Sequence, residues 1–272
     1  MSRRTTLPDR PAPAGFLASR AGQVTTAAMV LFAILTAFIG SGALFGTPVA
    51  EAAGGWLDED STWIAPASGA FRIWSVIYVG FVAYAVWQFF PAADTDRHRA
   101  ARPWILAGVL LNSGWLWVVQ AGWLALSTAV IAALVVCLSR VVMILERSAP
   151  TSRVEALLVD GTQGLYLGWV TIATITNVAA WLGSLGWEGN PPGPIAWTVI
   201  VILAAVVIGV ALALATRGRI APALSLAWGL AWVAVGRAGA TALESQTVTI
   251  AAAVAAGVIV VATVVSRVRR RR

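Results

Sequence analysis

The apolar segment 70–90 carries aromatic side chains at a spacing suited to ligand binding. Phe71, Trp74 and Tyr78 follow one another at intervals of three and four residues, which places them on one face of a helix. The rings of Trp and Tyr stack well on flat, conjugated or polycyclic molecules. The segment therefore predicts one wall of a pocket for a planar hydrophobic ligand.

Two further apolar segments add amide side chains to this pattern. Asn112 and Trp115 are neighbours on a helix over 103–121. At about 100° per residue, the segment 157–183 gathers a stripe about 120° wide: Tyr166, Trp169, Ala173, Asn177 and Trp181. An amide in hydrocarbon is costly without a partner, so both asparagines should face the bundle interior. They either cross-link the protein or hold the polar group of a ligand.

Arg72 and the loop 46–69 would lie beside this aromatic face. Arg72 can pair with a ligand carboxylate, with lipid headgroups or with the acidic side chains of the loop. The loop is the one long connection between apolar segments and contains four acidic residues together with Trp56 and Trp63. Long ordered loops often act as lids, so both tryptophans are lid candidates. An exposed acidic loop with interfacial tryptophans is the alternative.

The composition indicates a protein whose surface faces lipid. Of its 272 residues, 59% are hydrophobic and 11% are charged, whereas soluble globular chains have about 25% charged residues. The basic residues are all arginine and lie mostly between apolar segments, which favours a topological role over nucleic-acid binding. Cys137 and His98 are the only residues of their types, too few for a metal site. With no nucleophile–base pair or phosphate loop in view, we expect no enzyme.

Eight apolar segments approach the length of about 20 residues that a membrane helix needs. They lie at 23–45, 70–90, 103–121, 124–145, 157–183, 194–216, 221–236 and 247–266. With a cytoplasmic N-terminus, 17 of the 19 arginines fall on the cytoplasmic side, and only Arg72 and Arg237 do not. The sequence therefore predicts an all-α integral membrane protein of a bacterial cytoplasmic membrane, with eight spans and both termini in the cytoplasm.

Three motifs, in order, resemble the tryptophan-rich sensory/translocator-protein family. They match conserved patterns of the second, third and fifth helices of that family: Phe71, Trp74 and Tyr78; Leu111, Asn112 and Trp115; Tyr166, Trp169, Ala173, Thr174, Asn177 and Trp181. The resemblance covers 23–183 and implies a five-helix bundle there. It leaves 1–22 as a disordered tail, 194–266 as three additional helices and 267–272 as a basic tail.

The resemblance also implies a function and a set of site residues. Family members bind tetrapyrroles, sterols and synthetic polycyclic ligands in a pocket near the loop between the first two helices, and they often form homodimers. Transferred to this chain, the pocket is lined by Trp74, Tyr78, Asn112, Trp115, Trp169, Ala173 and Asn177, with Phe71 and Arg72 beside it and Trp56 and Trp63 in the lid. A porphyrin or haem-like molecule would be bound non-covalently.

Two functions are compatible with these residues. The first is a membrane sensor, carrier or chaperone for tetrapyrroles or similar planar hydrophobic molecules. The alternative is an ion-coupled secondary transporter of a small hydrophobic solute, for which Asp160 and Glu146 are the candidate acids. Both lie near the predicted cytoplasmic boundary, whereas coupling acids usually lie in mid-membrane.

Overall fold

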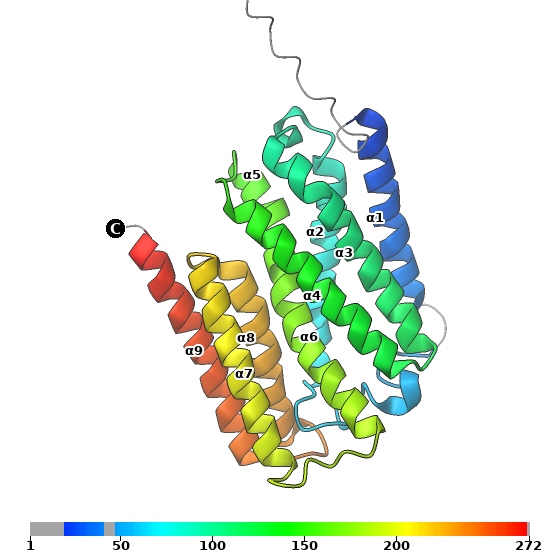
Figure 1. Ribbon diagram of the computed structural model, residues 1–272, viewed down its shortest axis with the longest axis vertical. Coiled ribbons are helices and arrows are strands. Elements are labelled where there is room, and N and C mark those ends of the chain that lie inside the picture. The colour runs from blue at the N-terminus through cyan, green and yellow to red at the C-terminus, as the bar shows by residue number, and fades with distance from the viewer. Residues whose placement is uncertain (1–18, 41–46, 271–272) are drawn as a thin grey trace, which may run out of the picture.

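The computed structural model describes residues 19–40 and 47–270, and this part of the chain contains helices and no strands. Eight long helices run between two ends of the molecule (Figure 1). They are α1 (Arg20–Gly40), α2 (Ile73–Trp87), α3 (Asp96–Gln120), α4 (Leu124–Glu146), α6 (Thr162–Ser184), α7 (Pro194–Ala215), α8 (Ile220–Val235) and α9 (Gln246–Arg270). The shorter elements are η2 (Ala52–Gly55), η3 (Ser68–Arg72), η4 (Pro91–Ala93), α5 (Arg153–Glu155), η5 (Ala156–Gly161) and η6 (Gly236–Ala240). The predicted all-α architecture is confirmed.

Seven of the long helices, some together with a short neighbouring element, are long and apolar enough to cross a bilayer. The other long helix, α3, has 25 residues, which is long enough to cross a bilayer, but it is less apolar than the other seven. Its first turns hold charged side chains, and Asn112, Ser113 and Gln120 add polarity further along, so the predicted span 103–121 covers only its less charged part. The position of the termini relative to the membrane stays a prediction.

The predicted tails differ from the helix boundaries where the structure describes them. The tail 1–22 lies outside the described residues up to 18, and α1 already begins at Arg20. At the other end, α9 continues through Arg270, so most of the basic segment 267–272 is helical. Arginine is a good helix former and is favourable in the last helical turn, which accounts for the longer helix.

Local sequence signals explain how α3 is bounded. The Thr95 side chain accepts a hydrogen bond from the His98 backbone N–H, a typical N-cap that begins α3. At its other end, Gly122 has a φ of 76°, a conformation that glycine adopts without strain. The chain reverses there in a tight turn, and α4 begins at Leu124.

The long helices form two groups that meet along α6. The first group packs α1 on α2 and α3, α3 on α4, and α4 on α6; the second packs α7 and α8 on α9. The groups meet where α6 contacts α8. Glycine permits this close contact, because a Cβ atom added to Gly168 would lie 2.1 Å from the carbonyl oxygen of Pro222. Gly229 of α8 likewise lies directly against the Ile172 side chain.

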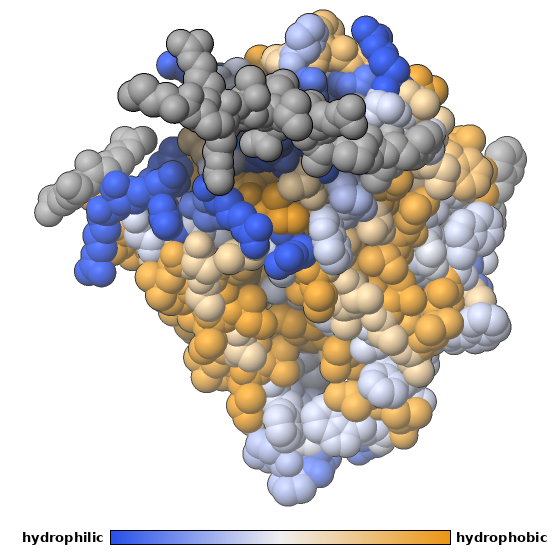
Figure 2. All heavy atoms as spheres, turned by 45° about the horizontal axis from the view of Figure 1, so that its top comes forward, coloured by the Kyte–Doolittle hydropathy of each residue, from blue (hydrophilic) through white to orange (hydrophobic). Residues whose placement is uncertain are grey.

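The distribution of apolar and hydrophilic side chains on the surface agrees with helices that cross a membrane. Apolar side chains cover the flank seen in Figure 2, and hydrophilic side chains gather at the end that is uppermost in Figure 1. Among the exposed apolar residues are Val79, Val136 and Val207, each more than two-thirds exposed. We call the end where α3 begins and α9 ends the arginine-rich end. The opposite end, formed by the loops 47–72, 121–123, 185–193 and 236–245, is the loop end.

Candidate functional site

Aromatic rings from α2 and α6 form one cluster near the loop end. The Trp74 ring stacks on Tyr78 with a centroid distance of 5.3 Å and an interplanar angle of 24°. It also meets Tyr166 and Trp169 edge to face at 5.8 and 6.3 Å. Phe71 packs edge to face on Trp169 at 5.6 Å. The predicted aromatic faces of the two helices are therefore directed at each other.

Two adjoining cavities lie beside this cluster. The larger has a volume of about 450 Å³ and is lined by Phe38, Val49, Ala50, Leu57, Asp58, Glu59, Ser68, Phe71, Trp74, Ser75, Tyr78, Trp115 and Leu116. The smaller has a volume of about 40 Å³ and is lined mainly from the loop 47–67 and from α6. Trp115 and Phe71 line both cavities, so the two are neighbours.

The structure brings most of the predicted site residues together and leaves three apart. The residues that line one or both cavities are Phe71, Trp74, Tyr78, Trp115, Trp169, Ala173, Asn177 and Trp56. Asn112, Arg72 and Trp63 line neither cavity. Asn112 is buried, with its side chain within hydrogen-bonding reach of the Tyr78 hydroxyl group, whereas Arg72 is exposed.

Asn177 cross-links three helices through its side-chain amide. Its Oδ1 atom accepts a hydrogen bond of 2.9 Å from Trp115 Nε1 in α3. Its Nδ2 atom donates to Ser127 Oγ at 3.0 Å and to Thr128 Oγ1 at 2.8 Å, both in α4. Both amide protons are thus used within the protein. Of the two roles left open by the sequence, the cross-link is the one that these contacts describe.

Trp169 has an unused hydrogen-bond donor. Its side chain is 2% exposed and lines the smaller cavity, yet its Nε1 atom has no hydrogen-bond partner among the described residues. Buried polar groups almost always find a partner, either in the protein or in a bound molecule. Helical spacing predicts that the Trp169 ring lies in the wall of the pocket. No sequence signal shows that its N–H group lacks a partner among the described residues.

Residues 47–67, which we call the covering loop, form the remaining wall of both cavities. Trp56 packs against α6 at Gly183, where an added Cβ atom would lie 2.8 Å from the indole ring. Glu59 accepts a hydrogen bond from the Ser68 backbone N–H and, like Asp58, lines the larger cavity. The loop expected to act as a lid therefore lies against the aromatic cluster. Of its two tryptophans, Trp56 lines the smaller cavity and Trp63 lines neither cavity.

Arg237, in η6 after α8, holds the covering loop in place. The side chain is 1% exposed. Its guanidinium group donates to the backbone carbonyls of Glu59 at 2.7 Å and of Thr62 at 3.3 Å. The Ala67 backbone N–H also donates to the Trp232 carbonyl at 3.1 Å. The additional C-terminal helices thus contact the site. The sequence does not predict this role, because every residue has a backbone carbonyl and residue types do not show which of them accept from Arg237.

Replacing Arg237 with methionine is expected to release the covering loop. Hydrogen bonds to charged groups contribute about 1.5–3 kcal/mol each, and part of this is regained when water reaches the carbonyls, so we expect a net loss of about 2 kcal/mol. Hydrogen exchange should accelerate at the backbone amides of 58–67. The Arg72→Met variant is the control because Arg72 is exposed at the same end. Equal exchange in both variants would contradict the anchoring role.

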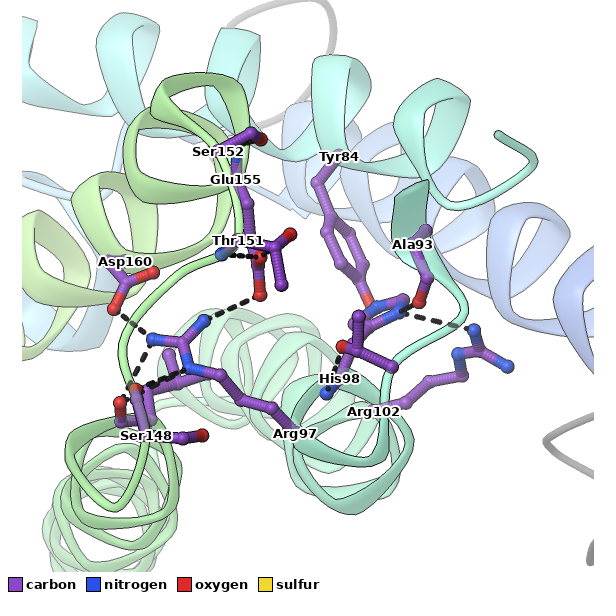
Figure 3. A network of polar contacts seen from close by, with 12 residues as sticks. Tyr84, Ala93, Arg97, His98, Arg102, Ser148, Thr151, Ser152, Glu155 and Asp160 are labelled. Atoms are coloured by element: carbon purple, nitrogen blue, oxygen red, sulfur yellow. Dashed lines mark hydrogen bonds and ion pairs between the residues drawn. The ribbon is translucent and has the colours of Figure 1, made fainter. Parts of the chain in front are cut away.

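A second polar network lies at the arginine-rich end (Figure 3). Arg97 donates to Glu155 Oε1 at 2.8 Å, to Asp160 and to the Leu145 carbonyl at 2.9 Å. Arg219, between α7 and α8, also pairs with Asp160 and with Glu146. The network therefore joins both helix groups, and η5, which carries Asp160, is a π-helical turn inside it.

His98 lies beside this network, in the first turn of α3. The imidazole is fully buried and contacts the Tyr84 hydroxyl group through Nε2 at 2.9 Å and the Ala93 carbonyl through Nδ1 at 2.8 Å. Burial, followed by the neighbouring Arg102 guanidinium, lowers the pKa of His98 to about 4. The imidazole is therefore neutral at neutral pH. The Thr95 cap begins α3 early enough to include this residue, ahead of the apolar segment 103–121.

No cluster of metal-ligating side chains is found in the described part of the chain. Among residues 19–40 and 47–270, no group of three or more His, Cys, Asp or Glu side chains is placed to hold a metal ion. In the network at the arginine-rich end, the carboxylates are paired with arginines. Any ligand of the aromatic cavities therefore meets rings, amides, hydroxyl groups and carboxylates in the described part of the chain.

Together, the long apolar helices define a polytopic α-helical membrane protein. The profile of the TSPO-like protein family matches residues 23–265, and the chain belongs to this family. The resemblance seen in the three motifs is thus confirmed, and the match extends across α7, α8 and most of α9. No curated protein and no solved structure matches the chain.

Proposed function

We propose that the protein binds planar hydrophobic ligands, tetrapyrroles among them, and acts without catalysis as a sensor, carrier or chaperone. The observation that carries this proposal is the 450 Å³ cavity lined by Phe71, Trp74, Tyr78 and Trp115. Pockets for small molecules typically have volumes of about 300–1,000 Å³, with apolar walls and a few polar groups. Membership of the TSPO-like family supports a ligand-binding or sensing role.

A fluorescence titration tests this function. Purified protein in non-ionic detergent is titrated with protoporphyrin IX while intrinsic tryptophan emission is recorded. We expect saturable quenching at micromolar or lower ligand concentration. The Trp169→Phe variant should bind about tenfold more weakly, because it loses ring area and the free Nε1 donor, a loss of ~1.4 kcal/mol.

The matched control for this titration is Trp104→Phe. Trp104 lies in α3 away from both cavities, where its ring faces the Arg140 guanidinium at 5.9 Å. This variant should bind protoporphyrin IX like the unmodified protein. Absence of saturable quenching, or equal weakening in both variants, would count against binding in the aromatic cavity.

The alternative function is ion-coupled transport, and its proton-coupled form requires an acid that gains and loses a proton. Both candidate acids are ion-paired: Asp160 with Arg97 and Arg219, and Glu146 with Arg219. Ion pairs of this kind join helices, and breaking one leaves a buried charge without its partner. The ligand-binding function is therefore the one we put forward. The homodimer implied by the family resemblance stays a prediction.

A further inference from the structure

The larger cavity has a negatively charged lining. Asp58 and Glu59 are its charged residues, and no arginine or histidine among the described residues lines either cavity. The Asp58 carboxylate accepts the Asp60 backbone N–H, and the Glu59 carboxylate accepts the Ser68 backbone N–H. Within the described residues neither carboxylate forms an ion pair, although Glu59 and the Arg237 guanidinium group attract each other at longer range, so both carboxylates can still act on a bound molecule.

The nearest arginines are not placed to serve an anionic ligand. Arg72 is exposed and lines neither cavity, and Arg237 is buried with its guanidinium group donating to backbone carbonyls. The loops of this end carry two arginines and six acidic residues, and the segment 41–46 contains no ionisable residue. Clefts lined by one sign of charge attract ligands of the opposite sign.

The aromatic walls favour the same sign of charge. A cation over the face of a Trp or Tyr ring gains about 0.5–2 kcal/mol from the negative face of the ring, and more when water is excluded. Trp74, Tyr78 and Trp115 supply such rings in the same cavity as the two carboxylates. Rings and carboxylates together form the chemistry that recognises organic cations.

The smaller cavity adds an independent requirement. Trp169 Nε1 is a buried donor without a partner among the described residues, and it belongs to the lining of this cavity. A ligand whose tip reaches this cavity satisfies the donor if it presents a hydrogen-bond acceptor there. Asp58 lines both cavities, so its carboxylate borders the larger cavity as well as the smaller one that Trp169 lines.

From these observations we propose that the site selects planar aromatic ligands bearing a cationic group, held by Asp58 and Glu59, and an acceptor directed at Trp169. This inference rests on the proposed ligand-binding function and specifies its ligand class. Within the tetrapyrroles it predicts weaker binding of molecules that have free propionate groups. A dianionic macrocycle would bring its carboxylates towards those of the covering loop.

Three derivatives of one macrocycle test the preference. Protoporphyrin IX is the dianion, its dimethyl ester is neutral, and its diamide with a quaternary ammonium group on each arm is the dication. Binding of each to the full-length protein is measured by tryptophan quenching in non-ionic detergent. We expect the dication to bind at least about tenfold more tightly than the dianion. Raising the salt concentration should reduce this ratio.

Isosteric variants locate the source of the preference. The double variant Asp58→Asn, Glu59→Gln retains side-chain oxygens that can accept from the Asp60 and Ser68 backbone N–H groups. In it the two charged derivatives should bind within about threefold of each other. Glu51→Gln is the matched control, since Glu51 is an exposed acid of the same loop that lines neither cavity. It should retain the full preference. Trp169→Phe should weaken all three derivatives by a similar factor.

The possible outcomes separate this inference from the proposed function. If the dianion binds as tightly as the dication, or if the preference survives in the double variant, the inference is overturned while ligand binding stands. If none of the three macrocycles quenches saturably, the proposed tetrapyrrole binding fails, and the inference fails with it. A preference for the dication that is lost only in the double variant supports both.

Discussion

Replacing Gly168 with alanine is expected to destabilise the protein by about 3 kcal/mol or more, because a backbone must move to admit one methyl group. The added Cβ atom would lie 2.1 Å from the Pro222 carbonyl oxygen and 3.0 Å from the Leu226 backbone nitrogen. Neither atom can rotate away as a side chain can. Thermal unfolding in detergent, followed by tryptophan emission, should show a large decrease in midpoint temperature.

The control for this substitution is Gly114→Ala in α3. Gly114 also lies within a long helix, but outside its own helical turns no atom of the described residues lies within 4 Å of its added Cβ. Alanine is favoured over glycine in helices by about 0.5–1 kcal/mol, so this variant should be as stable as the unmodified protein or slightly more stable. If both variants unfold at the same temperature, α6 and α8 do not approach each other as described.

Replacing Arg97 with methionine should have the second large effect. Glu155 has a fully buried side chain, and Asp160 is 9% exposed, so both lose a charged partner where water has little access. Removing one member of a buried ion pair typically costs about 3–5 kcal/mol. Denaturant unfolding in mixed micelles measures the loss. The additional change Glu155→Gln should restore part of it by removing one unpaired charge.

Arg99 provides the comparison two residues further along the same helix. It pairs with Asp94 and Asp96, but all three side chains are substantially exposed. Exposed ion pairs contribute about 0–1 kcal/mol, so Arg99→Met should leave stability almost unchanged. If the two methionine variants were equally stable, the ion pairs of Arg97 would be no more important than surface pairs.

Periodicity predicts which face a residue occupies, and that was enough to place most of the aromatic site. The intervals between Phe71, Trp74 and Tyr78 correctly put Trp74 and Tyr78 on one face, and the stripe through Trp169 and Asn177 correctly faced the interior. Amphipathic spacing reports these faces because it depends only on the geometry of a single helix.

Partners across helices could not be predicted in the same way. Asn177 binds Trp115, Ser127 and Thr128, and any of several polar residues would have satisfied the same sequence argument. Arg237 binds backbone carbonyls, which every residue possesses. Close contact at Gly168 depends on the path of α8 and not on any feature of α6 alone. These contacts are determined by the tertiary arrangement.

Anchoring of the covering loop by Arg237 has a consequence for the order in which the protein is made. Thr62 and Arg237 are 175 positions apart in the chain, so the ribosome releases the loop long before it releases the anchor. The first five long helices can enter the membrane while the loop beside their cavity is still unanchored. The wall that the covering loop gives to the cavities is therefore fixed in place only near the end of translation, after α8 has been synthesised.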